Sequence, residues 1–537
     1  MLIISQLRMG VDHSEAALKV AVAKTLKVTE SAIRQLAVDQ RAIDARRGYV
    51  EFTYTVLVEV DKEAEVLVRC QDKRVAIAPD ETYRELEAQT PVSEAGPRQR
   101  VIIIGTGPCG LLCGLMLARF GWRPLLLERG KAAGDRARDV TGFWRRQWPF
   151  DPNSNVQFGE GGAGTFSDGK LYTQIRDREH RIPWLLREFV RAGAPEDILF
   201  KSRPHIGTDR LIKVVRTLRE EIVSLGGEVR FGAHVTGVNI EAGRMSAIEL
   251  ADGTNLAADA FVFATGHSAR DTFEMLHAAG VPFEAKPFAV GVRIEHPQKL
   301  IDKSQYARLA GHSKLGAAPY RFVAHCPSGR SAFSFCMCPG GLVVASTSEP
   351  DQVVTNGMSS YARAEANANS GFMVELKPGD FANQSDLGGI ELQRELERKA
   401  FELGGGNYFA PVQLLGDFMR GLPSTGPGSV VPSYLPGVTW TDVTRCLPQI
   451  VTETLREAVP LVERQLPGFS MDDAVITGVE TRSSSPVRIP RDPETLVCPG
   501  VSGFYPAGEG AGYAGGIVSA AVDGMRVAER LIRGSQK

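Results

Sequence analysis

VIIIGTGPCGLLCGLMLARFGWRPLLLERG, residues 101–130, contains in order the parts of a dinucleotide-binding βαβ unit. Its first four residues are apolar β-formers and predict a buried strand, and the apolar run at 108–120 predicts a helix that Gly121 ends. Between them lies the glycine pattern Gly105-x-Gly107-x-x-Gly110. The first glycine permits a tight turn, the second lets a pyrophosphate approach the backbone, and the third lets helix and strand pack closely.

The second half of the same stretch supplies the acidic residue that such a unit needs. A second strand is predicted at 124–127, and Glu128 stands at its end, where a carboxylate can accept hydrogen bonds from ribose hydroxyls. Because all the parts follow in the required order, the stretch predicts a bound adenine dinucleotide. It does not distinguish NAD from FAD.

Length and composition set the broad class of protein. The chain has 537 residues and a formal net charge of -1, which predicts two or three globular domains and indicates neither a polyanionic partner nor an anionic membrane. There is no apolar run of about 18 residues and no signal-peptide pattern at 1–5, so a cytoplasmic location is expected. Eight cysteines in a chain of this length predict reduced thiols rather than a disulfide framework.

The pattern of elements predicts an N-terminal α+β module at 1–97. Its expected strands lie at 2–8, 49–59 and 65–69, and its expected helices at 14–27 and 29–40. A polar linker at 93–100 then leads to the dinucleotide fold.

Three further segments are predicted after this module. The first part of the dinucleotide-binding domain is expected at 98–275, a mixed and loop-rich substrate domain at 276–480, and the C-terminal part of the dinucleotide-binding domain at 481–537. Within the first of these, a helix is predicted at 209–225 with a cap at Thr208 or Asp209, followed by a strand at 228–231. The chain is expected to finish with a helix to Arg533.

The segment 504–517 favours a flavin over a nicotinamide. It places a short strand, an acidic residue and a glycine-rich turn directly before the terminal helix. A reduced flavin carries negative charge near its N1 and C2 carbonyl, and the positive end of a helix suits that charge. The residues in question are Gly508, Glu509, Gly515, Gly516 and Ile517.

These motifs, in this order, resemble the glutathione-reductase-type FAD flavoproteins. Within that group, five segments resemble the FAD-dependent dehydrogenases known as NAD(FAD)-utilising. The segments are GEGGAGTFSDGKL at 159–171, KSRPHIGTD at 201–209, FSFCMCPGG at 333–341, ETRSSSPVRI at 480–489 and YPAGEGAGYAGGI at 505–517. The resemblance implies an α/β fold: a discontinuous Rossmann-like FAD-binding domain, an inserted mixed α+β substrate domain and the small N-terminal α+β domain.

The resemblance also implies which residues hold FAD. The glycine turn with Pro108 would flank the pyrophosphate, Glu128 with Arg129 would hold the adenosine ribose, and the backbone near Val235 would meet the adenine. Gly508 and Glu509 would lie on the ribityl chain. The remaining expected contacts are Ala264, Thr265 and Gly266 beside the adenosine, Gly162, Gly164 and Thr165 in a loop that closes over FAD, and Lys170 as a nearby cation.

Catalytic candidates come from segments that return to the cofactor. Arg482 and Arg488 could clamp an anionic group of the substrate through paired donors, or they could tie two domains together. His267 follows the third cofactor segment and could transfer protons beside the flavin, although a single histidine is more often structural.

The cysteines allow two interpretations. Cys336 and Cys338 form a CxC, which is shorter than the CxxC of dithiol enzymes, and two residues on one strand face are explained equally well by packing. Cys109 and Cys113 lie one helical turn apart, where packing is the better explanation. No metal is predicted, because a zinc site built from His325, Cys326, Cys336 and Cys338 would need an irregular spacing.

The sequence as a whole predicts an FAD-dependent oxidoreductase that moves a hydride between flavin and a small organic substrate. A second glycine motif for NAD(P)H is missing, so NAD(P)H would visit transiently as electron donor, or electrons would pass to oxygen, a quinone or another protein. One alternative is a nucleic-acid-modifying enzyme whose N-terminal module binds RNA. Its only basic cluster is interleaved with acids, which argues against a nucleic-acid partner. The other alternative is a non-catalytic flavin-binding sensor, which would lack a substrate pocket; the large middle domain argues against it. The basic cluster consists of Arg34, Arg41, Arg46 and Arg47.

Overall fold

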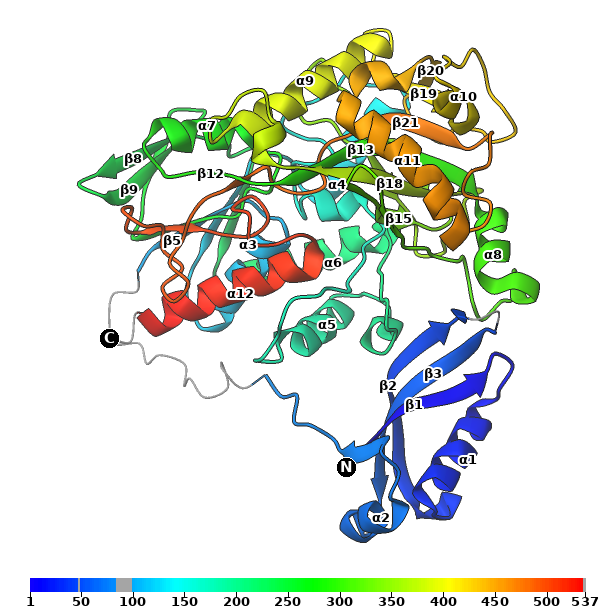
Figure 1. The fold of residues 1–537 in the computed structure, drawn as a ribbon. Helices are drawn as coiled ribbons and strands as arrows, with labels where there is room; N and C mark the ends of the chain where they lie inside the picture. Colours follow the sequence, from blue (N-terminus) through cyan, green and yellow to red (C-terminus); the bar gives the residue numbers. More distant parts are fainter. Residues whose placement is uncertain (47–48, 84–98, 535–537) are drawn as a thin grey trace.

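The computed structural model describes residues 1–46, 49–83 and 99–534. A small N-terminal module stands at one end of the molecule, and two larger sheets with their helices form the rest (Figure 1). Arg47 and most of the predicted linker, at 93–98, lie outside the described residues. Within the described residues, no helix is long and apolar enough to cross a membrane.

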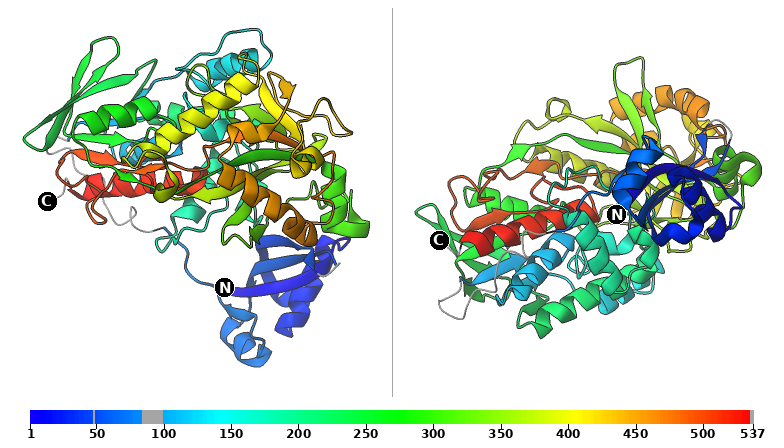
Figure 2. Two further views of the ribbon diagram at one scale, coloured as in Figure 1. Left: turned by 45° about the horizontal axis from the view of Figure 1, so that its top comes forward. Right: turned by 90° about the horizontal axis from the view of Figure 1, so that it is seen from below.

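The N-terminal module is a four-stranded antiparallel sheet with two helices (Figure 2). The strand order is β2-β3-β1-β4. Alternate residues of the third strand, among them Phe52, Tyr54, Val56 and Val58, are buried in the module's core. The elements are β1 (Leu2–Gly10), α1 (Glu15–Leu26), β2 (Ile33–Asp44), β3 (Glu51–Val60), α2 (Glu63–Cys70) and β4 (Val75–Ile77).

Two predictions for this module are wrong. The segment predicted as a helix at 29–40 is mainly β2, whose ladder with β3 runs from Ile33 to Asp44 and overrides the local helix preference. The segment predicted as a strand at 65–69 belongs to α2, in which Val66 and Cys70 share one buried face four residues apart.

The dinucleotide-binding sheet has five parallel strands in the order β23-β11-β5-β6-β7. The helices α3 and α12 pack against each other, and α6 packs against α3. The elements are β5 (Val101–Ile104), α3 (Pro108–Arg119), β6 (Leu125–Glu128), α6 (Thr208–Ser224), β7 (Glu228–Phe231), β11 (Ala260–Phe263), β23 (Phe504–Pro506) and α12 (Ile517–Gly534).

The glycine-led βαβ unit and the strands at 228–231 and 504–506 are confirmed. The predicted cap of α6 is not. Gly207 is its N-cap residue, the helix begins at Thr208, and Asp209 instead accepts a hydrogen bond from the Tyr361 amide at 2.8 Å.

Further elements are attached to this sheet. An antiparallel sheet of β8, β9 and β10 projects beside α7. The elements are α4 (Ala133–Trp144), α5 (Arg181–Arg191), β8 (Val235–Glu241), β9 (Arg244–Leu250), β10 (Asn255–Ala257) and α7 (Arg270–Ala278).

The middle of the chain builds a seven-stranded sheet in the order β14-β15-β18-β13-β21-β19-β20, antiparallel except between its last two strands. Helix α11 contacts β14, β15 and β18, and α9 contacts β19 and β21, so both helices cover this sheet (Figure 1). The strands are β13 (Phe288–Pro297), β14 (Val323–His325), β15 (Ser331–Cys338), β18 (Asn367–Leu376), β19 (Ala410–Leu414), β20 (Val438–Trp440) and β21 (Val475–Glu480).

Two short strand pairs lie outside the two large sheets, and one of them, β16 with β17, packs on the seven-stranded sheet. They are β12 (Glu284–Ala285) with β22 (Val487–Arg488), and β16 (Leu342–Ala345) with β17 (Thr355–Met358). The remaining helices are α8 (Gln298–Tyr306), α9 (Gly388–Leu403), α10 (Leu415–Arg420) and α11 (Gln449–Gln465).

Candidate functional site

A cavity of about 960 Å³ lies between the two large sheets. The residues at or just after the carboxyl ends of all five parallel strands line it, which is where open α/β sheets bind ligands. The opposite wall comes from β15, from the segment before β14, and from residues 482–484 after β21. Its size is that of a pocket for a large cofactor together with a small ligand.

Each of the three glycines of the first turn is required for a different structural reason. Gly105 has φ +102°, and a Cβ there would lie 2.4 Å from the carbonyl oxygen of Ala264. A Cβ on Gly110 would lie 1.9 Å from the carbonyl oxygen of Gly105, so helix and turn touch through backbone. At Gly107 the nearest atom to a Cβ would be the Gly162 Cα at 3.9 Å, and the residue lines the cavity. Only this glycine leaves its space to a ligand.

Glu128 is held rigidly at the end of β6. Its carboxylate accepts hydrogen bonds from the Thr106 amide (3.0 Å) and hydroxyl (2.8 Å) and from the amides of Gly130 and Gly159 (3.0 Å each). The side chain is 5% exposed and lines the cavity. A hydroxyl can rotate, so the Thr106 donor is the one that a ribose hydroxyl can replace.

Beside Glu128 lies a cluster of charged and polar side chains, Arg129, Asp271 and His234, which was not predicted from the sequence. Arg129 lines the cavity, but its guanidinium donates to both carboxylate oxygens of Asp271, at 3.0 and 2.8 Å. His234, next to Val235, lies 3.1 Å from the same carboxylate. Burial disfavours the charged carboxylate, yet His234 and Arg129 hold the pKa of Asp271 below its usual range. The one feature of the sequence that could have indicated His234 is its position next to Val235, which was predicted to lie near the adenine.

The glycine loop at 161–164 lies directly over the first turn. A Cβ on Gly162 would come within 3.1 Å of the Gly107 Cα, and one on Gly164 within 3.1 Å of the Ile517 side chain. Both glycines line the cavity. Thr165 does not, because its buried hydroxyl donates to the Glu160 carbonyl at 3.3 Å.

The C-terminal motif brings the start of α12 to the cavity. Gly515, Gly516 and Ile517 all line it, and the Gly515 amide donates to the Ser519 hydroxyl at 3.1 Å. Gly508 lies behind the wall, with its amide on Asp523 at 2.8 Å. Glu509 faces the cavity, and burial raises its pKa to about 7.

The segment after β11 contributes Ala264, Thr265, Gly266 and His267 to the same cavity. Burial, with the cations Arg482 and Arg270 nearby, lowers the pKa of His267 to about 3. Its Nδ1 lies 2.9 Å from the Ser268 hydroxyl. The imidazole is therefore neutral at physiological pH, when it can share hydrogen bonds but carries no charge.

The two candidate arginines are not brought together. Arg482 lines the cavity, but its guanidinium donates to both carboxylate oxygens of Glu397, at 3.1 and 2.7 Å. Arg488 is exposed, stacks on the Tyr513 ring and does not line the cavity. The predicted clamp therefore does not form.

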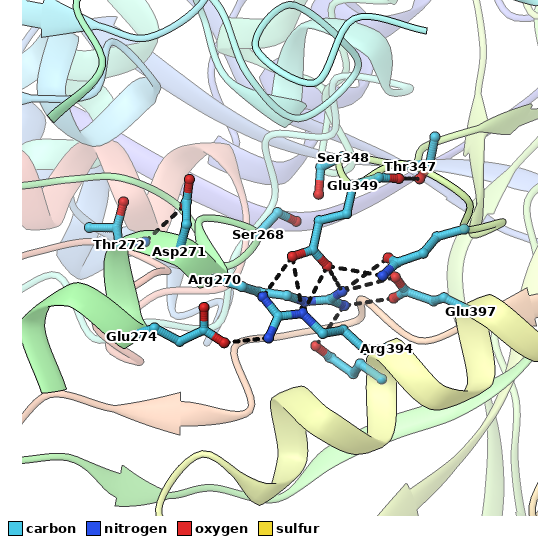
Figure 3. A network of polar contacts seen from close by, with 12 residues as sticks. Ser268, Arg270, Asp271, Thr272, Glu274, Thr347, Ser348, Glu349, Arg394 and Glu397 are labelled. Carbon is cyan, nitrogen blue, oxygen red and sulfur yellow. Dashed lines mark hydrogen bonds and ion pairs between the residues drawn. The ribbon is translucent and has the colours of Figure 1, made fainter. Parts of the chain in front are cut away.

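Glu397 is the centre of a buried ion network (Figure 3). Arg270 donates to Glu397 at 3.0 and 2.7 Å and to Glu349 at 2.7 Å, and Arg394 donates to Glu349 at 2.7 Å. This network joins α7, α9 and the segment after β21. It supports the other interpretation of Arg482, a tie between domains.

Lys170 lines the cavity, and its ammonium lies 3.0 Å from Asp168. Cys109 and Cys113 are buried in the core beneath the glycine turn, as packing predicts. All eight cysteines are free. Among the described residues there is no group of three or more histidine, cysteine or acidic side chains that could hold a metal.

A parallel sheet with a glycine turn, a buried acid at the end of its second strand in the chain and a cavity shared with a second sheet together form a mixed α/β fold with an open site at the carboxyl ends of the parallel strands. Residues 287–483 match the family described as FAD-dependent protein, C-terminal domain-like, and residues 1–59 match a domain of unknown function, DUF8436. A protein of Clostridium beijerinckii, described as uncharacterized, is 44% identical over 531 residues, which are 98% of each chain. The chain belongs to the same family as this protein.

Solved structures match this chain at low identity and with low TM-scores. The flavin-dependent brominase Bmp2 is 12% identical, with 82% of this chain and 80% of that chain covered and a TM-score of 0.36. The L-proline dehydrogenase from P. horikoshii is 11% identical, with 81% and 94% covered and a TM-score of 0.34. These scores are too low to support an argument about function, which depends on the site itself.

Proposed function

We propose that this protein is an FAD-dependent oxidoreductase that moves a hydride between bound flavin and a small organic substrate. The observation that carries the proposal is the continuity of the cavity, which runs from Glu128 and the glycine turn past the start of α12 to the inserted sheet. A dinucleotide bound at the first end has room to reach the second. The family description of residues 287–483 supports FAD as that dinucleotide.

The residues fit FAD in three places. Gly107 and Gly162 leave a cradle that a Cβ would begin to fill, which suits a pyrophosphate. Glu128 offers a carboxylate to the adenosine ribose. The start of α12 presents the positive end of a helix where a reduced flavin would carry negative charge. A bound flavin would supply the two-electron chemistry, and the protein supplies orientation and electrostatics.

Proton handling in this proposal belongs to Glu509. Because its pKa is near 7, this carboxyl can hold or release a proton at physiological pH. Lys286 also lines the cavity and supplies a cation close to Glu509, although burial with Arg488 nearby lowers its pKa. His267 is a hydrogen-bonding wall residue in this scheme rather than a general acid.

NAD(P)H as a transient electron donor and a cytoplasmic location are further parts of the proposal. An RNA-binding role for the N-terminal module is not favoured, because two described arginines of its basic cluster, Arg34 and Arg46, pair with acidic residues, and the guanidinium of Arg41 packs on the Phe52 and Phe200 rings. Arg34 and Arg46 pair with Asp61 and Asp44, and the Arg41 backbone bonds to residues 200 and 202 beside the dinucleotide domain.

The test is to release and identify the cofactor and then to reduce it. We expect the purified protein to be yellow and to release FAD on denaturation, and the bound flavin to bleach anaerobically with NADH or NADPH. A metabolite panel then identifies the oxidising or reducing substrate. Protein that binds no flavin after purification and reconstitution would refute the proposal.

A further inference from the structure

Cys336 and Cys338 lie at an irregular point of β15, on the wall of the cavity. The ladder between β15 and β18 shifts register between Phe335 and Cys338, and Cys336 has φ +42°, in the left-handed region that non-glycine residues rarely adopt. Cys336 lines the cavity, and Cys338 lies fully buried behind it. Backbone strain of this kind is typical of functional sites.

A buried ammonium group lies over both sulfur atoms. The Lys170 Nζ is 3.9 Å from the Cys336 Sγ and 3.8 Å from the Cys338 Sγ. Its carboxylate partner, Asp168, is shared with Arg363, which lies 2.5 Å away. Because Asp168 also compensates Arg363, it offsets the positive charge of Lys170 only in part. The remaining positive charge can stabilise a thiolate on either cysteine.

A second cation approaches from the neighbouring strands. Arg293 on β13 donates to the Cys336 carbonyl at 2.9 Å, and its Nε lies 3.0 Å from Glu480. Burial raises the pKa of Glu480 to about 8 in spite of Arg293, so this carboxyl is mostly protonated at neutral pH. The charges that act on the Cys336 thiol are then Lys170 and Arg293 against Asp168, whose own charge is also offset by Arg363. The net positive charge favours a thiolate.

The two thiols are unequal. A hydrogen bond from Cys338 lowers the pKa of Cys336 well below its usual range, with help from Lys170 and Arg293 against burial. The same hydrogen bond and burial raise the pKa of Cys338. Cys109 also lines the cavity, but burial and Asp523 raise the pKa of its thiol. Of the two cysteines that line the cavity, only Cys336 therefore has a lowered thiol pKa and a second thiol of raised pKa beside it.

We propose that Cys336 and Cys338 form a redox-active pair that exchanges two electrons with the flavin of the same cavity. This inference rests on the proposed function. In the oxidising direction the Cys336 thiolate and the Cys338 thiol lose two electrons and one proton, and one S–S bond forms between them. The electrons and the proton pass to oxidised FAD, which becomes its two-electron-reduced anion, so charge and atoms balance. The reverse reaction cleaves the disulfide.

The reactivity of the two thiols can be measured by peptide mass and by alkylation, and neither measurement requires enzyme activity. Trypsin releases both cysteines on one peptide, 331–363, which holds no other cysteine. After equilibration in oxidising thiol–disulfide buffer, we expect this peptide to be two hydrogen atoms lighter and resistant to iodoacetamide. In reduced protein near pH 6 we expect Cys336 to be alkylated at least about tenfold faster than an ordinary thiol.

Variants separate the roles of charge and packing. Lys170→Met should slow alkylation of Cys336 about tenfold near pH 6 and move its pH profile upward, and Lys170→Arg should restore much of the rate. Glu480 and Glu509 face the same thiol, so the profile is recorded between pH 5 and 9. Cys498→Ala, in the core on the far side of the parallel sheet, is the matched control and should change neither the rate nor the peptide.

The electron count tests the link to flavin. In an anaerobic reductive titration of the oxidised holoprotein, the wild type should take up twice as many electrons as Cys338→Ser, which keeps only the flavin. Equal uptake, or a Cys336 thiol with an ordinary pKa and no intrapeptide disulfide, would overturn the pair. A protein without flavin refutes the proposed function and the exchange together, while the peptide and alkylation results report on the thiols alone.

Discussion

Gly107→Ala should weaken FAD binding without weakening the fold. The residue has φ -68° and ψ -178°, which alanine adopts freely, and the new methyl group would meet only the Gly162 Cα, at 3.9 Å. The change at this N-cap costs the helix less than about 1 kcal/mol. The methyl group would instead occupy space where a pyrophosphate approaches the backbone. Overpacking of this kind costs about 1–3 kcal/mol, which corresponds to roughly 5- to 150-fold weaker binding.

The assay compares two quantities in the same samples. Fluorescence titration of apoprotein with FAD gives the dissociation constant, and urea unfolding of apoprotein gives the free energy of unfolding. Gly426→Ala, where a Cβ meets nothing within 4 Å, is the matched control and should change neither. Gly105→Ala should behave in the opposite way to Gly107→Ala, because its Cβ would lie 2.4 Å from a backbone oxygen and the apoprotein itself would lose stability. FAD binding by Gly107→Ala as tight as that of the wild type, or an equal loss of stability in both variants, would contradict the role assigned to Gly107.

Three substitutions of acidic residues test other parts of the site. Glu128→Gln places an amide group against backbone donors, so we expect FAD binding and apoprotein stability each to fall by about 1–3 kcal/mol, measured by titration and urea unfolding; unchanged values would contradict the assigned hydrogen bonds. Glu397→Gln leaves the buried cations Arg270 and Arg482 poorly compensated and should cost about 3–5 kcal/mol. The pKa of Glu397 is lowered, because these arginines outweigh burial, so this difference in urea unfolding should shrink as the pH falls below 4.5; a difference that grows would count against it. The pKa of Glu509 is raised to about 7, so wild-type stability should decline as pH rises from 4.5 through 7, and Glu509→Gln should remove roughly 1–3 kcal/mol of that decline in thermal unfolding; parallel pH curves for both proteins would refute it.

Local signals allowed the cofactor end of the site to be predicted. The glycine turn, Glu128 and the start of α12 are each set by a short stretch whose backbone conformation depends on its own residues. The same locality explains the errors at 29–40 and 65–69. There the pairing with β3, and the single buried face of α2, decide the structure from outside the segment.

The substrate end could not be predicted, because contacts distant in sequence build it. Lys170 reaches Cys336 across 166 positions, and nothing in either motif indicates the other. Arg482 and Arg488 are six residues apart, yet the irregular segment between them directs Arg482 into the ion network and leaves Arg488 exposed. A side chain's direction in an irregular segment depends on tertiary packing, which a motif does not record.

The order of strands in the parallel sheet has a consequence for how the protein is made. β11 lies between β5 and β23, and about 400 residues separate these two along the chain. At about 5–20 residues per second, a ribosome takes roughly 20–80 s to pass from one to the other. During that time the seven-stranded sheet at 288–480 can fold. The parallel sheet, in contrast, still lacks its edge strand β23 and the helix α12 that packs against α3. The last wall of the cavity, from residues 509–520, is therefore made only after the rest of both large sheets, so the FAD of the proposed function could find a complete site only then.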